Sequence, residues 1–353
     1  MLGVYILKQS LIGSSFSSRW PLSPSTSRED EYMVPIFEHL RARLDVHSGA
    51  QKSKKPLFVG ISAPQGCGKT TLTEYLQEMF EEDGLSCAVM SLDDFYLTNQ
   101  DQEALAKAFP TNPMLQYRGN AGSHDLSLIE ETMECLASLS TSAAFGAGSD
   151  RPECSGHGRF ESSMEALSEK TALVPRYNKT AFGGRGDRVK RKEDWTTVKS
   201  PVDVVLFEGW MLGFRPIAQA DADALDTAKM AQVNAPLFPS PVDMTGFSQV
   251  NKLLAGPGYR GLHRRFDSWV VFGLNNVDQV FEWRRDAEKA QGNGLTDEQV
   301  RDFVARFMPS YRACLEDMYA HGPDRRDNVS PEDVLHFTVG ADRCPVEPIG
   351  RDR

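Results

Sequence analysis

A short glycine-rich run followed by lysine and threonine is the part of this sequence best suited to chemistry. Residues 56–71 read PLFVGISAPQGCGKTT. In such a loop the backbone N–H groups can turn onto phosphate oxygens without side-chain clash, and the next helix presents its positive end to the same charge. Lys69 is placed for the β and γ phosphates of ATP or GTP, and Thr70 for the accompanying Mg²⁺ ion.

The sequence on both sides of this loop favours a nucleotide site over a glycine turn without a ligand. An apolar strand is predicted over 57–61, and Leu72, Leu76, Met79 and Phe80 then recur at helical spacing before Gly84. The strict pattern has glycine where this chain has Ala63, which is small enough for the same turn. The predicted nucleotide contacts are Ala63, Pro64, Gln65, Gly66, Cys67, Gly68, Lys69, Thr70 and Thr71.

Two carboxylates follow the next apolar run, which covers residues 87–92. Asp93 and Asp94 lie 24 and 25 residues after Lys69, which is room for one helix and one returning strand. Ligands bind at the carboxyl edge of such sheets, so either carboxylate could take a proton from an attacking hydroxyl group. The alternative for this pair is a turn or a helix cap.

A third acid, Glu208, closes the apolar run over 202–207. An acid in this position of a nucleotide site holds magnesium directly or through water, and the alternative is a solvated charge at a strand end.

Polar, cation-bearing segments over 118–125, 175–179 and 183–192 have the composition expected of loops that grip a small anion. The default interpretation of such charge runs is a solvated surface, and a lone histidine is more often structural than catalytic. The residues that we assign to substrate binding are Asp94, Tyr96, Arg118, His124, Asp125, Arg176, Tyr177, Lys179 and Arg185. Arg188 is an alternative to Arg185.

Arg284 lies in the charged helical stretch EWRRDAE. It is either an ordinary surface arginine or a lid arginine that neutralises charge developing on the transferred phosphoryl group. In the second case it joins Asp93 and Lys69 as a catalytic residue.

These residues require a sheet whose strand ends meet at one edge. Buried apolar runs over 57–61, 87–92, 202–207, 269–274 and 334–339 alternate with helical stretches, which predicts a mostly parallel sheet covered on both faces, the α/β P-loop NTPase fold. We expect one domain over 29–345, surface insertions near 139–163 and 218–245, and a tail over 346–353. A helix capped by Thr296 should kink or restart at Pro309.

Composition excludes several classes of protein. A formal net charge of −10 disfavours a nucleic-acid partner, and no apolar run reaches the roughly 20 residues that span a bilayer. The six cysteines are scattered, which is typical of reduced thiols. Residues 1–28 contain eight serines and no acid, which suits an organelle transit peptide or a disordered tail. The sequence leaves the oligomeric state open.

The ordered blocks between residues 55 and 325 resemble plant-type D-glycerate 3-kinases, which belong to the P-loop kinase group of uridine kinase, phosphoribulokinase and pantothenate kinase. These blocks are GISAPQGCGKTT, SLDDFYLT, RGNAGSHDL, PRYNKTAFGGRGDR, VVLFEGWMLGF, EWRRDAE and LTDEQVRDFVARFMPSY. The chain departs from the family at Asn178, where an acid is usual, and at Arg285-Asp286.

The resemblance implies transfer of the γ-phosphoryl group of ATP, with Mg²⁺, to D-glycerate. It implies Asp93 as the base, with Asp94 still possible, and Arg118, Arg176 or Arg185 as the partner of the substrate carboxylate. It also implies a chloroplast location, with the cytoplasm or mitochondrion as alternatives. The competing functions are a kinase of another small alcohol, such as uridine, pantothenate or ribulose 5-phosphate, and a non-catalytic nucleotide switch.

Overall fold

The computed structural model describes residues 30–50, 55–139, 170–231, 237–290 and 296–348. The predicted transit peptide over 1–28 and nearly all of the predicted insertion over 139–163 lie outside these ranges, so both stay predictions. No helix among the described residues is long and apolar enough to cross a membrane.

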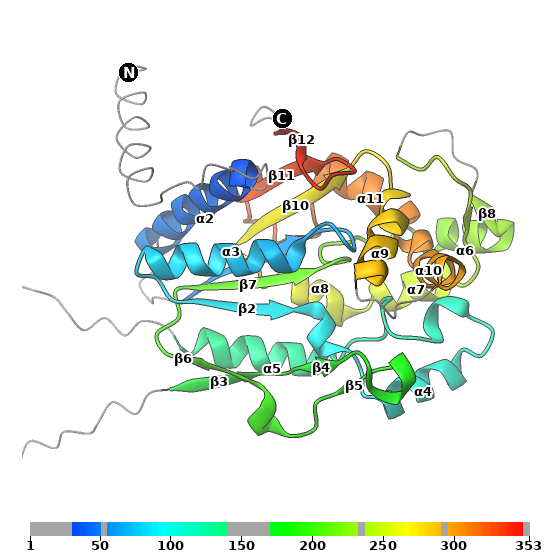
Figure 1. The fold of residues 1–353 in the computed structure, drawn as a ribbon, viewed down its shortest axis with the longest axis horizontal. Helices are drawn as coiled ribbons and strands as arrows, with labels where there is room; N and C mark the ends of the chain where they lie inside the picture. Colours follow the sequence, from blue (N-terminus) through cyan, green and yellow to red (C-terminus); the bar gives the residue numbers. More distant parts are fainter. Residues whose placement is uncertain (1–29, 51–54, 140–169, 232–236, 291–295, 349–353) are drawn as a thin grey trace, which may run out of the picture.

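A six-stranded sheet forms the centre of the molecule (Figure 1), in the order β12-β11-β10-β1-β7-β2. Its strands are β1 (Leu57–Ser62), β2 (Cys87–Ser91), β7 (Val204–Gly209), β10 (Ser268–Leu274), β11 (Val334–Val339) and β12 (Pro345–Pro348). All neighbouring pairs are parallel except β11 with β12. Every residue of β1, β7 and β10 is buried, so both faces of the sheet are covered, as a parallel sheet requires.

The order of the strands places a ligand site at the end of β1. From β1 the chain passes to β2 at the edge of the sheet and returns to β7 beside β1, and β10 then joins the other side of β1. The crossovers therefore diverge from β1, and such a switch point opens a crevice at the carboxyl ends of the strands. The register pairs Glu208 of β7 with Ile61 of β1 and with Ser91 of β2, so the predicted site residues leave the sheet at one edge.

Helices cover both faces of the sheet, and most of them are amphipathic. On one face α3 packs against α2, β2 and β7, and on the other α5 packs against α8. The helices are α2 (Asp30–Ala50), α3 (Lys69–Glu82), α4 (Asn99–Ala108), α5 (Leu126–Ala137), α6 (Gln219–Ala228), α7 (Phe247–Leu254), α8 (Pro257–His263), α9 (Gln279–Ala290), α10 (Asp297–Ala305) and α11 (Met308–His321). Short 3₁₀ turns are η1 (Leu92–Phe95), η2 (Pro113–Leu115), η3 (Ala181–Gly184), η4 (Lys192–Asp194) and η5 (Pro331–Asp333).

Three pairs of short strands lie outside the central sheet. They are β3 (Thr171–Val174) with β6 (Thr196–Lys199), β4 (Tyr177–Asn178) with β5 (Asp187–Arg188), and β8 (Met230–Ala231) with β9 (Val242–Asp243), all antiparallel. The segment 177–188, which comprises β4, η3 and β5, is called the flap below.

The predicted strands are confirmed, with small shifts at their ends. The strand after α3 is β2, which ends at Ser91, so Asp93 and Asp94 lie in η1. Glu208 lies inside β7 and does not follow it. The Thr296 capping box with Gln299 is confirmed, and the helix restarts with Pro309 in the first turn of α11. Proline is tolerated there because the first N–H groups of a helix have no partner within it.

Two predicted boundaries are wrong. The segment 218–245 is not a surface excursion without regular structure, because it contains α6, β8 and β9, and Phe238 and Met244 are fully buried. The mixture of Ala and Asp gave no clear helical period, although the segment forms α6, which packs against α7 and buries Ala222. The predicted tail over 346–353 begins too early, since β12 runs to Pro348.

Candidate active site

The phosphate loop (residues 63–71) connects β1 to α3 as predicted. Gly66 and Gly68 have φ of 81° and 96°, in the left-handed region that only glycine enters readily. These residues turn the backbone back so that α3 begins at Lys69. The Lys69 ammonium donates to the Pro64 carbonyl at 3.1 Å, which holds the side chain folded over the loop. Thr70 is exposed at the first turn of α3.

Residues from far along the chain support the outside of the phosphate loop. The Gln65 N–H donates to the Tyr311 hydroxyl of α11 at 3.0 Å. The Arg343 Nε donates to the Gly66 carbonyl at 2.7 Å, and the Arg343 guanidinium lies over the Trp283 ring of α9. The loop is therefore held between α11, α9 and the turn between β11 and β12.

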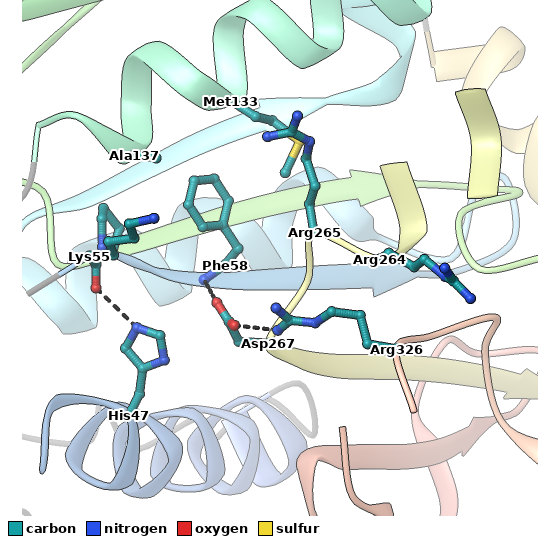
Figure 2. Close-up of a pocket in the computed structure, with 10 residues that line it drawn as sticks. His47, Lys55, Phe58, Met133, Ala137, Arg264, Arg265, Asp267 and Arg326 are labelled. Carbon is teal, nitrogen blue, oxygen red and sulfur yellow. Dashed lines mark hydrogen bonds and ion pairs between the residues drawn. The ribbon is translucent and has the colours of Figure 1, made fainter. Parts of the chain in front are cut away.

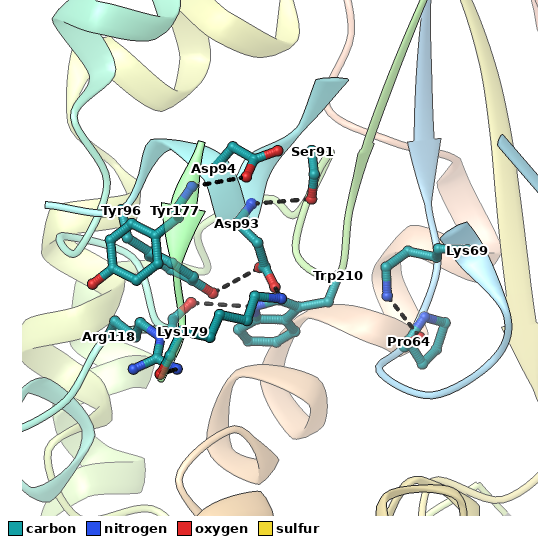
Figure 3. Close-up of polar contacts among 11 residues, drawn as sticks. Pro64, Lys69, Ser91, Asp93, Asp94, Tyr96, Arg118, Tyr177, Lys179 and Trp210 are labelled. Carbon is teal, nitrogen blue, oxygen red and sulfur yellow. Dashed lines mark hydrogen bonds and ion pairs between the residues drawn. The ribbon is translucent and has the colours of Figure 1, made fainter. Parts of the chain in front are cut away.

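Asp93 is the carboxylate that faces the phosphate loop from across the site. Its Oδ1 accepts from the Tyr96 hydroxyl at 2.8 Å, and its Oδ2 accepts from the Lys179 ammonium of the flap at 2.6 Å. Figure 3 shows Asp93 and Lys179 between Lys69 on one side and Tyr177 on the other. Burial alone would raise the pKa of Asp93, but the Lys179 charge, with further help from Lys69 and Tyr96, lowers it to about 2. Asp93 is therefore ionised at neutral pH.

Asp94 points to the other side of η1 and has a different environment. Its Oδ1 accepts from the Tyr177 N–H at 3.2 Å, which fixes the start of the flap. Burial, with the nearby negative charge of Asp93, outweighs that hydrogen bond and raises the pKa of Asp94 to about 6. The two neighbouring acids therefore lie in different environments, since Asp93 faces the site and Asp94 holds the start of the flap.

Glu208 is buried near the phosphate loop. Burial raises its pKa, while the nearby Lys69 charge and a hydrogen bond with Ser91 act in the opposite direction. Within the described part of the chain no three acidic, histidine or cysteine side chains form a metal site of their own. A hydroxyl and a carboxylate are oxygen donors of the kind that magnesium prefers, and that ion usually takes its other ligands from phosphates and water. Thr70 and Glu208 therefore fit a nucleotide-borne ion.

An aromatic stack backs Asp93. Tyr96 lies against His124 with ring centroids 4.8 Å apart, and the His124 Nδ1 is 2.8 Å from the Tyr259 hydroxyl of α8. Burial lowers the pKa of His124 to about 4, so the ring is neutral at pH 7. That His124 and Tyr96 contact substrate stays a prediction. The Tyr96 hydroxyl donates to Asp93, and His124 stacks on Tyr96.

The predicted substrate arginines do not converge on one point. The Arg118 guanidinium donates to the Gly184 carbonyl at 2.8 Å and lies over the Tyr177 ring, so it fastens the flap. Arg176 is exposed, and so is Arg185, whose guanidinium lies 5.5 Å from the Tyr117 ring centre.

Asp125 and Arg188 hold the other end of the flap. Asp125 caps α5 through the Leu128 N–H and pairs with Arg188 at 2.9 Å. Arg188 also donates to the Tyr96 carbonyl at 2.9 Å. Both residues therefore have structural partners that connect the flap to η1 and α5.

Arg284 lies on α9, the helix whose neighbouring residue Trp283 contacts the phosphate loop. It pairs with Glu288, and its guanidinium is 4.7 Å from the centre of the Phe303 ring of α10. The predicted lid arginine therefore lies on the helix whose Trp283 is next to Gly66, and its guanidinium has its partners in α9 and α10.

Sequence reasoning missed two side chains that shape the site. Tyr311 closes the block LTDEQVRDFVARFMPSY without an assigned role, yet its hydroxyl accepts from the Gln65 N–H. Trp210 follows Glu208 in the FEGW motif, and its Nε1 donates to the Gly119 carbonyl at 3.1 Å (Figure 3). The rings of Trp210 and Tyr311 meet edge to face at 5.0 Å, which joins the two sides of the crevice. The tryptophan of the FEGW motif could have indicated Trp210 from the sequence.

Comparison with known proteins identifies the chain's family. No family model matches. The chain is 37% identical over 330 residues to the chloroplastic D-glycerate 3-kinase of Arabidopsis thaliana, covering 92% of this chain and 62% of that relative. The chain thus spans less than two thirds of that relative's length. It is 34% identical over 273 residues to a probable ATP-dependent kinase of Saccharomyces cerevisiae, covering 75% of this chain and 80% of that protein.

A solved structure matches this chain over almost its own whole length. The D-glycerate 3-kinase of Cryptococcus neoformans superposes with a TM-score of 0.70 at 31% identity, covering 90% of this chain and 98% of that one. The fold, the phosphate loop and the order of the motifs are consistent with this similarity. The chain belongs to the D-glycerate 3-kinase family of P-loop kinases.

Proposed function

We propose that this protein transfers the γ-phosphoryl group of ATP to a hydroxyl group of D-glycerate, giving 3-phosphoglycerate. The observation that carries the proposal is the placement of Asp93. It is an ionised carboxylate in η1, just after β2, influenced by the Lys69 charge of the phosphate loop on one side and paired with a flap lysine on the other. A kinase for a small anionic alcohol needs these three groups together.

ATP fits the phosphate loop with little rearrangement. The turns at Gly66 and Gly68 would present backbone N–H groups to the phosphates, and Lys69 would exchange its Pro64 carbonyl for phosphate oxygens. Thr70 and Glu208 would hold Mg²⁺, which when bound would neutralise phosphate charge. The raised pKa of Glu208 reflects burial that a cation would offset.

Asp93 acts as the general base in the proposed reaction. The substrate hydroxyl oxygen forms a bond to the γ phosphorus while the bond from that phosphorus to ADP breaks, and ADP keeps the electron pair. The hydroxyl proton passes to Asp93 Oδ2. The Tyr96 hydroxyl holds Oδ1, so the carboxylate stays oriented while Oδ2 receives the proton.

Lys179 supplies the proposed recognition of the glycerate carboxylate. Its ammonium occupies Asp93 Oδ2, so the substrate hydroxyl can reach that oxygen only after Lys179 moves. When Lys179 leaves the Asp93 carboxylate, the substrate carboxylate would take its place as the partner of the lysine. The exchange keeps the lysine paired and favours an anionic substrate over a neutral one. Of the predicted arginines, Arg118 serves this step indirectly by fastening the flap.

Arg284 completes the proposal as a lid residue. Its pairing with Glu288 leaves it 37% exposed on the helix that contacts the phosphate loop. A change of rotamer would bring a delocalised positive charge toward the phosphates, where it would stabilise charge in the transition state.

The test measures ADP release with magnesium ATP and a panel of acceptors: D-glycerate, L-glycerate, uridine, pantothenate and ribulose 5-phosphate. Lys69→Ala is the blank, and ³¹P NMR identifies the product. Stimulation by D-glycerate with 3-phosphoglycerate as product supports the proposal, and Asp93→Asn should then lower kcat by roughly a hundredfold or more while ATP still binds.

Other results would reassign the function. Stimulation by a different acceptor would keep the kinase chemistry and change the substrate. ATP binding without acceptor-dependent ADP release would favour a nucleotide switch. Full turnover in Asp93→Asn would overturn the assignment of the base.

A further inference from the structure

The turn between β11 and β12 lies against the phosphate loop, although the two segments are far apart in the sequence. The Arg343 Nε donates to the Gly66 carbonyl at 2.7 Å, across 277 positions of the chain. The Trp283 Nε1 of α9 donates to the Ala341 carbonyl of the same turn at 2.7 Å. Trp283 also lies against Gly66, where an added Cβ would be 2.7 Å from the Trp283 Cβ. The turn, α9 and the loop are therefore packed together.

Arg343 has a backbone conformation that an arginine rarely adopts. Its φ is 62°, in the left-handed region that glycine, asparagine and aspartate enter more readily. The turn is closed by hydrogen bonds from the Gly340 N–H to the Cys344 carbonyl and from the Arg343 N–H to the Gly340 carbonyl. Glycine would make the same turn with less strain, so the turn itself does not require an arginine. Its side chain has specific partners, the Gly66 carbonyl and the Trp283 ring, whose centre is 5.5 Å from the guanidinium.

The Gly66 carbonyl belongs to the peptide group that also carries the Cys67 N–H. That N–H is 3.5 Å from the Pro64 carbonyl, to which the Lys69 ammonium also donates at 3.1 Å. The two donors therefore converge on one oxygen, as they would on an oxygen of a bound phosphate. A cation bound to the carbonyl end of a peptide group polarises it and strengthens the hydrogen bond of its N–H end. Arg343 can thus act on a phosphate donor without touching the phosphate.

We propose that Arg343 is a positioning residue for ATP. Its bond to the Gly66 carbonyl holds the phosphate loop in the turn that binds phosphate, and it strengthens the Cys67 N–H as a donor. The hairpin of β11 and β12 thereby sets the affinity for the nucleotide. This inference rests on the proposed binding of ATP by the phosphate loop and is independent of the acceptor, so the KM for ATP should change and the KM for D-glycerate should not.

The test is isothermal titration calorimetry of the full chain with magnesium ATP and with magnesium tripolyphosphate, without an acceptor. Arg343→Met removes the donor and the charge but keeps a long side chain, and Arg343→Gly removes the side chain but suits the φ of 62°. Both variants should weaken ATP binding about three- to tenfold, because one charge-assisted hydrogen bond at an accessible position is lost. Tripolyphosphate should weaken by the same factor, because the bond acts on the loop and not on the base. Arg343→Lys keeps a cationic donor and should recover most of the affinity.

Thermal unfolding separates this effect from a loss of general stability. Arg343→Gly should unfold close to the wild-type temperature, because relief of backbone strain offsets the lost contacts. The control is Arg326→Met. Arg326 also donates to a backbone carbonyl, that of Phe266 at 3.1 Å, and it pairs with Asp267 in the wall of a hollow of about 570 Å³ (Figure 2). Asp267 directly precedes β10, so this hollow lies at the amino ends of the strands, away from the phosphate loop. Arg326→Met should lower the unfolding temperature and leave ATP affinity unchanged.

The outcomes distinguish a failure of this inference from a failure of the proposed function. A wild-type protein that bound neither ATP nor tripolyphosphate would overturn both. Wild-type affinity for ATP in Arg343→Met and Arg343→Gly would overturn the role of Arg343 alone. Weaker binding of ATP with unchanged binding of tripolyphosphate would also overturn it, since Arg343 would then act on the base or ribose. Equal weakening of ATP binding in Arg326→Met would show that the effect is not specific to the phosphate loop, which would refute the inference.

Discussion

The ammonium of Lys179 donates to Oδ2 of Asp93 at 2.6 Å, and this bond joins the flap to η1. The other carboxylate oxygen accepts from Tyr96, so protein donors occupy both oxygens of Asp93. The flap is therefore coupled to the proposed base by charge. A movement of the flap that removed Lys179 would change the charge environment of Asp93.

The first prediction concerns Lys179→Met. Lys179 is the strongest influence that lowers the pKa of Asp93, and its loss leaves burial to raise that pKa from about 2. A base must be ionised, so the acid side of the pH profile of kcat/KM should move to higher pH. If Lys179 also holds the substrate carboxylate, the KM for D-glycerate should rise tenfold or more. Steady-state kinetics between pH 5 and 8 measure both effects.

Lys190→Met is the matched control for this variant. Lys190 follows the flap and is 83% exposed, with only a distant pairing to Asp187 at 3.9 Å. It should leave both the pH profile and the KM as in the wild type. An unchanged KM and profile in Lys179→Met would remove Lys179 from the mechanism.

The second prediction concerns the support of the phosphate loop by Tyr311. Tyr311→Phe leaves the Gln65 N–H without its acceptor, which costs about 1–3 kcal/mol when the group is shielded from water. We expect the KM for ATP to rise severalfold and the protein to lose about 1 kcal/mol of unfolding free energy. Kinetics and urea unfolding measure the two effects.

Tyr319→Phe provides the comparison on the same helix. Its hydroxyl donates to the Phe272 carbonyl of β10 at 3.3 Å and not to a residue of the phosphate loop. This variant should lose a similar free energy of unfolding with no change in the KM for ATP. The same rise in that KM for both variants would show that Tyr311 acts through general stability and not through Gln65.

The local parts of the site could be predicted from the sequence, and the long-range pairings could not. The phosphate loop is one continuous segment whose strand, turn and helix each have a pattern, so its bounds agree with the structure. Asp93 follows from its spacing to Lys69. The partner of Asp93 is a lysine 86 residues further on, and the Gln65 support comes from a tyrosine 246 residues away. No periodicity links such pairs, because tertiary packing alone brings them together.

Cationic motifs were the least predictable part. Arginine in a glycine-rich loop suits either an anion or a backbone carbonyl, because a guanidinium has five N–H donors. Arg118 donates to carbonyls of the flap, and Arg188 is shared between Asp125 and a carbonyl. The sequence indicated that these segments could bind an anion but could not tell which of their cations the fold itself uses.

The third prediction is a dependence of stability on pH that originates from Asp94. Its pKa is raised from an ordinary value of 3.8 to about 6, first because of burial. Between these two values the folded protein keeps a proton that the unfolded chain has released, so the unfolding free energy falls as pH rises, and it levels off above pH 6. Asn cannot titrate but still accepts from the Tyr177 N–H.

Urea unfolding of wild type and Asp94→Asn at half-unit steps from pH 4.5 to 7.5 measures this effect. The stability of the variant relative to wild type should increase with pH up to about 6, by an amount on the order of 2 kcal/mol because Asp94 is partly exposed. A difference that is constant across this range would mean that Asp94 titrates normally.

The fourth prediction separates the two reasons for glycine at position 66. Gly66 has φ of 81°, and a Cβ there would lie 2.7 Å from the Trp283 Cβ of α9. Gly84, after α3, has φ of 77° with open space around it. Gly84→Ala should therefore cost only the backbone strain, about 1–2 kcal/mol, and leave ATP affinity unchanged. Gly66→Ala should cost more, because it pushes α9 away from the phosphate loop, and should weaken ATP binding at least tenfold in calorimetry. Equal losses of stability and equal ATP affinities in the two variants would mean that the contact between Gly66 and Trp283 contributes nothing to the nucleotide site.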